Sequence, residues 1–453
     1  MNCNEMIKSV VENDMCIGCG VCTLYCKSNS IEMKVNKHGF YNANIVGDCN
    51  CNGNCIKVCP FNPSPENKVR TEDEISRLFL IESNKHHPKI GSYINTYAGY
   101  SVKHRLTSSS GGIATYTLTK LMEMGAIQHV ISVKAGDGSA AHYEYSISSN
   151  IEGLNNAAKT KYYPVTLATV LKNVKELDGK VAIVGVACFI KAIRLAQSQD
   201  EEFKNKVGFL IGIICGGVKS SFFAEYLASK AGVAVNEFSH PEFRIKDHNS
   251  AASNYSYGCL DKMNNQQTIK MRIVGDMWGT GLFKANACDF CDDVTTELAD
   301  LSLGDAWLEP YSNDGRGTNV MVTRSYLADK IINDGFAKGD LEIEVLPETI
   351  FLASQQGSYN HRHDGLGYRI NKSEVNSIPP KRFDTIKISP LLKTIQSMRM
   401  KSRKKSLEIW SDTKNASDFD LQMEKYLYWL KLFTKINHYQ RAIIRRIYKL
   451  VSR

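Results

Sequence analysis

Clustered cysteines constrain this chain more than any other feature. Eight of its 14 cysteines lie between Cys16 and Cys59, in a chain of 453 residues. A disulfide scaffold suits short secreted chains, and the N-terminus shows no charged segment followed by an apolar run that would mark an export signal. In a reducing compartment, clustered thiols are metal ligands. We therefore predict a cytoplasmic metal-binding protein.

The first cysteine run has the spacing of a bacterial two-cluster ferredoxin. It reads Cys16-Ile-Gly-Cys19-Gly-Val-Cys22-Thr-Leu-Tyr-Cys26. In such modules the fourth cysteine of each run ligates the other cluster. That rule assigns one [4Fe-4S] cluster to Cys16, Cys19, Cys22 and Cys59. Gly18 and Gly20 let the backbone wrap closely around it. A zinc site is the alternative, because paired cysteines also bind zinc.

The second run departs from the regular spacing. It reads Cys49-Asn-Cys51-Asn-Gly-Asn-Cys55-Ile-Lys-Val-Cys59-Pro60. Counted back from Cys59, the middle ligand falls at position 52, where Asn52 stands, so Cys51 comes one residue early. A loop distortion at Gly53 would let Cys51 serve. We predict a second [4Fe-4S] cluster on Cys26, Cys49, Cys51 and Cys55, with a three-iron or labile cluster as the alternative.

Composition divides the chain into four parts. We expect a ferredoxin-type module over residues 1–70, a linker with one short helix over 71–92, a mixed α/β body over 93–380 and a helical tail over 381–453. Within the body, apolar runs predict strands at Val181–Val186 and Val207–Cys215. Helical periodicity covers Gly112–Met124, Ile190–Gln197 and Ser221–Lys230. The fold class is therefore α+β, and no apolar run is long enough to predict a transmembrane helix.

The positive charge of the chain is concentrated in the tail. Residues 381–453 hold 18 Lys and Arg against 6 Asp and Glu, whereas the whole chain has a net charge of +9. Apolar spacing predicts helices at Leu391–Trp410 and Leu421–Tyr448. A basic helical tail suits docking to a partner protein or to a membrane surface as a peripheral protein. The alternative is a solvated helical appendage, and we do not predict a nucleic-acid partner.

Two further patterns in the body carry chemistry. Cys188 and Cys215 each end an apolar strand, and Cys288 and Cys291 form a C-x2-C pair. The four thiols are candidates for a third cluster, with buried core thiols and zinc as alternatives. The block Ser108-Ser109-Ser110-Gly111-Gly112 opens a predicted helix, where backbone amides bind anions. Plain N-capping of the helix from Ile113 is the alternative.

These blocks, in their order, resemble the family of coenzyme F-420 hydrogenase/dehydrogenase beta subunits. The resemblance runs from the cysteine-rich module to about residue 375. It rests on the serine–glycine block, Lys161-Tyr162, Gly185-Val186-Ala187-Cys188, Cys215-Gly216-Gly217, Phe243-Arg244, Cys288-x2-Cys291-Asp292, and Ala299-Asp300 through Gly304-Asp305-Ala306-Trp307. Where the family usually has Gly-x-Pro-Cys, this chain has Ala187 before Cys188.

The resemblance implies cofactors and roles for named residues. It implies FAD and a [4Fe-4S] cluster in the body, the cluster on Cys188, Cys215, Cys288 and Cys291. It implies that Ser109, Ser110, Gly111 and Gly112 hold the flavin diphosphate. Lys161 would neutralise phosphate or tune the flavin, with an ordinary surface lysine as the alternative.

The resulting functional prediction is an iron–sulfur flavoprotein oxidoreductase. Clusters would exchange single electrons with a redox partner protein, and FAD would exchange hydride with a small molecule, of which coenzyme F-420 is the candidate. The alternative is an electron-transfer subunit of a larger complex with no substrate site of its own.

Overall fold

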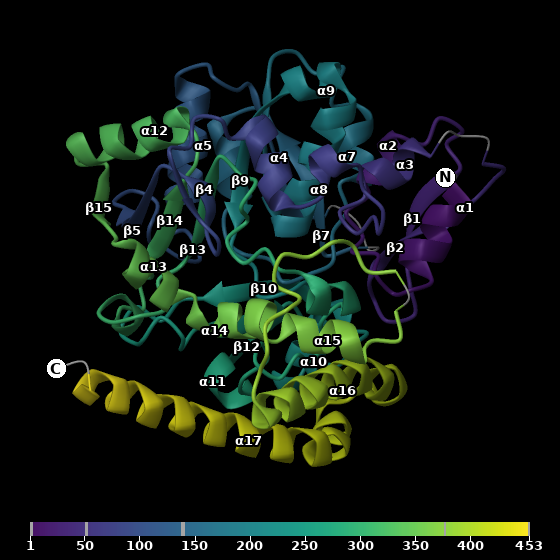
Figure 1. Ribbon diagram of the computed structural model, residues 1–453, viewed down its shortest axis with the longest axis vertical. Helices are drawn as coiled ribbons and strands as arrows, with labels where there is room; N and C mark the ends of the chain where they lie inside the picture. Colours follow the sequence, from purple (N-terminus) through teal and green to yellow (C-terminus); the bar gives the residue numbers. More distant parts are fainter. Residues whose placement is uncertain (1–2, 50–52, 137–140, 376, 452–453) are drawn as a thin grey trace.

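The computed structural model describes residues 3–49, 53–136, 141–375 and 377–451, and its centre is an eight-stranded mixed sheet (Figure 1). The strand order is β15-β5-β14-β13-β9-β8-β6-β7. Neighbours among β6, β8, β9 and β13 are parallel, and the remaining pairs are antiparallel. The strands are β5 (Asn95–Ser101), β6 (His129–Ala135), β7 (Tyr143–Ser148), β8 (Val181–Val186), β9 (Val207–Ile213), β13 (Leu301–Asp305), β14 (Asn319–Thr323) and β15 (Leu341–Val345).

Helices cover both faces of this sheet. Alternate residues of a strand point to opposite faces, so Ala182 and Ile211 join one core while Ile183 and Leu210 join the other. The first core contains α5 (Ile113–Glu123) and α12 (Tyr326–Ala337), and the second contains α8 (Ala187–Gln199) and α10 (Ser221–Lys230). The predicted strands at β8 and β9 and the predicted helices at α5, α8 and α10 are confirmed. The fold is mixed α and β, as expected.

The cysteine-rich module packs directly on the body. It comprises α1 (Cys3–Met6), η1 (Ile7–Val11), α2 (Val21–Leu24), the antiparallel strands β1 (Ile31–Val35) and β2 (Tyr41–Ile45), α3 (Asn54–Lys57) and η2 (Asn67–Val69). Its buried Val21 and Ile56 belong to the same apolar core as Leu167 and Phe189 of the body. The two regions therefore share one continuous core.

The segment expected to be a linker contains the short helix that was predicted there. Helix α4 (Glu72–Phe79) begins with a capping box, in which Thr71 and Glu74 satisfy each other's backbone amides. Two short strands follow, β3 (Lys85–His87) and β4 (Gly91–Tyr93). Ile75 is fully buried, and Glu72 forms a buried ion pair with Lys191 of α8 at 2.9 Å. The segment is thus packed against the body.

A second sheet and several short helices complete the body. The antiparallel strands β10 (Ser239–Ile245), β11 (Ser256–Leu260) and β12 (Gln266–Lys270) form this three-stranded sheet. The remaining elements are α6 (Ile151–Asn156), α7 (Ala168–Lys172), α9 (Glu201–Lys206), α11 (Met271–Val274), η3 (Asn286–Phe290), η4 (Tyr311–Asn313), α13 (Glu348–Ser354), α14 (Gln356–Tyr359), η5 (Asn360–Asp364) and α15 (Leu366–Lys372).

The tail forms the two helices that were predicted, α16 (Pro390–Thr413) and α17 (Ala416–Val451), which run along one edge of the molecule (Figure 1). The solvated-appendage alternative is wrong for α16. Trp410 is fully buried against Tyr226, and Arg403 donates to the buried Asp289 at 2.8 Å. An apolar inner face and a buried ion pair hold this helix on the body. Among the described helices, none has the length and apolar character to cross a membrane.

Candidate cofactor sites

The first predicted cysteine set comes together in the structure. Cys16, Cys19, Cys22 and Cys59 line one small cavity of about 20 Å³. Burial raises the pKa of all four thiols, to about 12 for Cys19, and the neighbouring sulfurs raise the pKa values of Cys22 and Cys59 further. In the absence of a nearby cation, these thiols therefore stay protonated at neutral pH.

Two glycines shape the loop around this cavity. Gly18 and Gly20 both have positive φ, +76° and +79°. A Cβ on Gly18 would lie 2.7 Å from the Tyr41 carbonyl oxygen, and one on Gly20 would lie 2.7 Å from the amide nitrogen of Ala168. The loop therefore needs glycine both for its conformation and for its close approach to neighbouring chain.

The second predicted set is only partly described. Cys26 accepts a hydrogen bond from the Ser30 amide at 3.2 Å, and Cys55 is buried close enough to Cys22 to raise its pKa. Cys49 is disulfide-bonded. Cys51 lies outside the described residues. The second set remains a prediction from sequence.

The four body cysteines converge from separate segments. Cys188 lies in the first turn of α8, Cys215 follows β9, Cys288 lies in η3 and Cys291 follows it. Burial raises the pKa of Cys188 well above its ordinary value, and the other three sulfurs raise it further. The amides of Gly217 and Val218 donate to the sulfurs of Cys215 and Cys288, each at 3.2 Å. Amides aimed at sulfur stabilise thiolate ligands.

A buried arginine that sequence patterns did not reveal faces this set. Arg362 comes from the π-helical turn η5 and is 3% exposed. Its guanidinium donates to the Cys291 sulfur at 3.5 Å and to the Asp293 carbonyl oxygen at 2.5 Å. The sulfurs of Cys291, Cys215 and Cys288 raise the pKa of Arg362 despite its burial. The arginine therefore supplies a fixed positive charge beside the thiols.

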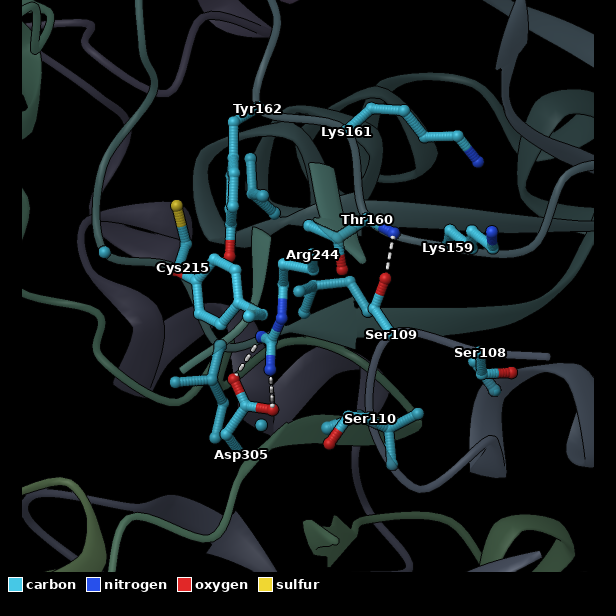
Figure 2. A pocket seen from close by; sticks show the side chains of 18 of the residues that line it. Ser108, Ser109, Ser110, Lys159, Thr160, Lys161, Tyr162, Cys215, Arg244 and Asp305 are labelled. Atoms are coloured by element: carbon cyan, nitrogen blue, oxygen red, sulfur yellow. Dashed lines mark hydrogen bonds and ion pairs between the residues drawn. The ribbon is translucent and has the colours of Figure 1, made fainter. Parts of the chain in front are cut away.

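A cavity of about 940 Å³ opens beside the body cysteines (Figure 2). Its wall includes Cys215, so the cavity and the cysteine set share a residue. The predicted serine–glycine block and Lys161 also line it, together with Arg244 and Asp305. Cavities of 300–1,000 Å³ are typical of small-molecule and cofactor sites. The site predicted for a flavin is therefore hollow and adjoins the thiols.

The serine–glycine block lies in this wall. The helix α5 begins after Gly112, which is the N-cap residue with φ +80°, and no side chain caps the helix. Ser109 Oγ accepts from the Thr160 amide at 2.7 Å, Ser110 Oγ donates to the Thr318 carbonyl at 3.1 Å, and the buried Ser108 Oγ has no protein partner. The block therefore supplies the N-cap residue through Gly112, its serine hydroxyls do not cap the helix, and one unpaired hydroxyl remains at the cavity.

Charged groups gather around the same block. Arg244 forms a two-pronged ion pair with Asp305, one contact being 2.8 Å, although its backbone has a strained φ of +59°. Lys246 donates to the Ser110 carbonyl at 2.7 Å, and burial lowers its pKa to about 7. Nothing in the sequence singled out Lys246, because a lone lysine directly after a strand belongs to no recognisable motif. Its ammonium also donates to the carbonyls of Arg105 and Arg316.

Lys161 is half-buried and is not directed at the serine block. Its ammonium donates to the carbonyl oxygens of Ala157 and Ala158, the latter at 2.7 Å, and Figure 2 shows it running away from the Arg244–Asp305 pair. Burial lowers its pKa to about 7. A role toward phosphate would require the ammonium to leave these carbonyls.

Aromatic side chains form another part of the wall. The rings of Tyr162 and Trp278 lie 4.8 Å apart edge to face, and the ammonium of Lys219 lies 4.5 Å from the Trp278 ring. Burial lowers the pKa of Lys219 to about 7. A wall of large aromatic rings suits a planar heterocycle.

The first cysteine set and the body set are close neighbours. The charge of Cys19 raises the pKa of Cys188, and both sulfurs raise the pKa of the buried Tyr145. The Leu167 amide also donates to the Cys19 carbonyl at 2.9 Å. Tyr145 lines the large cavity as well. The structure therefore places two thiol sets and one cavity in succession.

Comparison with known proteins identifies two matching segments. Residues 96–172 match the N-terminal part of the coenzyme F-420 hydrogenase/dehydrogenase beta subunit, and residues 178–349 match the C terminus of the same beta subunit. Together the matches cover more than half of the chain, including the cavity and the body cysteines. The cysteine-rich module lies outside both matches.

Three relatives share low but extended similarity. A coenzyme F-420-dependent sulfite reductase of Methanocaldococcus jannaschii is 22% identical over 59% of this chain, and the match spans only 45% of that protein. One component of the F(420)H(2) dehydrogenase of Methanosarcina mazei is 21% identical over 66% of this chain and 77% of that component. The beta subunit of a coenzyme F-420 hydrogenase from Methanococcus voltae is 26% identical over 45% of this chain and 72% of its own length.

Among solved structures, a chain of the F-420-reducing [NiFe] hydrogenase complex from Methanosarcina barkeri is similar. It aligns with a TM-score of 0.48 and 20% identity, over 65% of this chain and 99% of that chain.

Proposed function

Because this chain belongs to the family of coenzyme F-420 hydrogenase/dehydrogenase beta subunits, we propose that it is an iron–sulfur flavoprotein oxidoreductase. It would relay electrons between a ferredoxin-like partner protein and FAD, and then to or from a hydride carrier, with coenzyme F-420 as the first candidate. The observation that carries the proposal is the contact between body thiols and cavity, since Cys215 belongs to both. When bound, clusters exchange single electrons and flavin couples them to hydride transfer.

The residues fit the two kinds of cofactor. For the clusters, two sets of four thiols, each buried or partly buried, lie together in the structure. Within the described residues, no three His, Cys, Asp or Glu side chains come close enough together to hold a single metal ion. Thiolates around a [4Fe-4S] cluster each bind a different iron and so enclose a larger volume than ligands of one zinc ion do. The second set, Cys26, Cys49, Cys51 and Cys55, completes the proposed ferredoxin module of residues 1–70.

For FAD, the fit rests on the cavity and its unpaired polar group. Ser108 Oγ is buried without a protein partner, and Ser109, Ser110, Gly111 and Gly112 lie beside it. Arg244 lines this end of the cavity in an ion pair with Asp305, and Lys246 lies behind the serine block, where its ammonium donates to the Ser110 carbonyl. We propose that the diphosphate binds at this end. The aromatic wall around Trp278 would hold the planar ring. Along the sequence, the proposed parts are the module, the linker (71–92), the body (93–380) and the tail (381–453). The proposed compartment is the cytoplasm.

Anaerobic purification with iron, sulfide and flavin quantification tests the proposal. We expect about twelve irons and one FAD per chain, since each [4Fe-4S] cluster holds four irons. About eight irons would leave one cysteine set empty. Clusters without flavin would refute the enzyme proposal and favour the electron-transfer subunit that lacks a substrate site. Bleaching of the flavin band by reduced coenzyme F-420 would then identify the hydride carrier.

A further inference from the structure

The outer side of α17 is apolar and uncovered. Trp429 is 51% exposed and Tyr439 61% exposed, and Figure 1 shows this helix at the edge of the molecule. At 3.6 residues per turn, its exposed apolar side chains fall within about 100° of the helix circumference. We call them the outer stripe: Leu421, Tyr428, Trp429, Leu432, Ile436, Tyr439 and Ile443.

The fold does not use the outer stripe. Phe419, Met423 and Leu430 point the other way and are at most 1% exposed. Leu430 packs with Leu392 and Ile395 of α16, and Phe419 packs with Phe283 and Trp410. One apolar face already holds α17 on the body. The second apolar face therefore serves something outside this chain.

Basic side chains dominate along most of the stripe. No Asp or Glu follows Glu424, whereas three lysines lie between it and Ile443, namely Lys425, Lys431 and Lys435. Arg441 lies on the other side of the helix, where it pairs with Asp364. Lys431, Lys435 and His438 line a groove of about 380 Å³ on one flank of the helix, opposite Asp276. A basic flank beside an apolar stripe attracts an anionic surface.

We propose that the outer stripe binds the surface of an anionic lipid membrane, with α17 lying in the plane of the lipid headgroups. The stripe spans about 33 Å at 1.5 Å per residue, and a long straight stripe suits a flat surface. Trp429, Tyr428 and Tyr439 belong to the residue types that gather at membrane interfaces. Lysines flank them and can extend toward headgroup phosphates. The helix lies on the membrane and does not cross it.

Vesicle co-sedimentation of the full chain tests this proposal. The probes are vesicles of phosphatidylcholine alone and vesicles of equal parts phosphatidylcholine and phosphatidylglycerol. We expect at least about tenfold tighter binding to the anionic vesicles, since each basic residue near such a surface contributes about 1 kcal/mol. Raising the salt concentration should weaken this binding.

Two variants locate the binding surface. W429S/L432S should lower binding to anionic vesicles about tenfold with an unchanged melting temperature, because both side chains are partly or mostly exposed. The matched control, Y326S/F336S, removes two exposed aromatic rings from α12 and should leave binding unchanged. Equal binding to both vesicle types, or no binding, would overturn the proposal. So would a dimer that W429S/L432S dissociates, since a second copy would then cover the stripe.

Discussion

The two cysteine sets that the structure brings together are built in opposite ways. In the module, Cys16, Cys19 and Cys22 come from one tight loop, and only Cys59 is remote. In the body, Cys188, Cys215 and the Cys288/Cys291 pair are brought together by the folding of the large sheet. The cysteine spacing along the sequence therefore predicts the module set. We expect the shape of its loop to depend on ligation. In the body set only the Cys288/Cys291 pair shows a ligand spacing, and the set rests on the scaffold of the large sheet.

The sharpest way to break this comparison is to remove one ligand from each set. C288S should lose about four of about twelve irons and keep the body folded, because the eight-stranded sheet has its own apolar core. C16S should also lose about four irons. In addition it should lower the melting temperature, because the helices and strands of the module are all short and lean on ligation more than the large sheet does. Iron content and thermal melting measure both effects. A C288S protein that melts earlier than C16S would contradict the difference in scaffolding.

The junction between module and body can be tested at Gly20. G20A places a Cβ 2.7 Å from the Ala168 amide nitrogen in a left-handed backbone of φ +79°. The backbone cost alone is about 1–2 kcal/mol, and the contact adds to it. Gly125 offers a matched control, because it has φ +70° with nothing within 4 Å of a Cβ. The free energy of unfolding should therefore fall further in G20A than in G125A. Equal losses would mean that the two regions do not pack at this point.

The positive charge of Arg362 lies beside the body cysteines and should therefore affect the redox potential of the body cluster alone. R362Q removes a buried cation that faces Cys291, and so it should favour the oxidised, less negative state of the body cluster. We expect the midpoint potential of the body cluster to fall by about 60 mV, which is a tenfold change in the equilibrium constant of a one-electron reduction. R362K keeps the charge and should restore most of the potential. Redox titration followed by electron paramagnetic resonance measures this, and the module signals should stay in place. A shift of all signals together would point to a general loss of structure.

The smallest expected effect is a pH dependence of FAD binding. Lys246 has a pKa of about 7, lowered mainly by burial and also by Arg244 and Arg105, with Asp305 and Asp314 opposing. A bound diphosphate would favour the charged lysine and raise its pKa. Binding then takes up a proton above pH 7, so affinity should fall as the pH rises, by up to about tenfold per pH unit.

K246Q should flatten this dependence. The matched variant K161Q should preserve it, because the Lys161 ammonium donates to the Ala157 and Ala158 carbonyls, whereas the Lys246 ammonium donates to the Ser110 carbonyl of the serine block itself. Fluorescence titration of the flavin-free protein with FAD gives the affinity. The opposite pattern, in which only K161Q flattens the curve, would assign the diphosphate end of the cavity to Lys161.

Regular patterns made part of the molecule predictable from sequence. Apolar spacing predicted seven elements correctly, because each is long or buried enough to show a regular spacing of apolar residues. These are the strands β8 and β9 and the helices α5, α8, α10, α16 and α17. The spacing of the first run also gave the set around Cys19. Lys246 and Arg362 could not be found in this way, since each meets its partners only through the tertiary fold. The packing of α4 was missed for the same reason, because the partner of Glu72 lies in α8.

The ion pair between Asp289 and Arg403 limits how freely the tail can be exchanged between related chains. Asp289 follows Cys288 directly and is buried between Lys284 and Arg403, the latter supplied by the tail. Losing one partner of a buried pair costs about 3–5 kcal/mol. A chimera that carried a foreign tail would leave this carboxylate short of a partner next to a cysteine of the body set. We therefore expect such a chimera to be less stable than this chain, unless the new tail also supplies a cation at the position of Arg403.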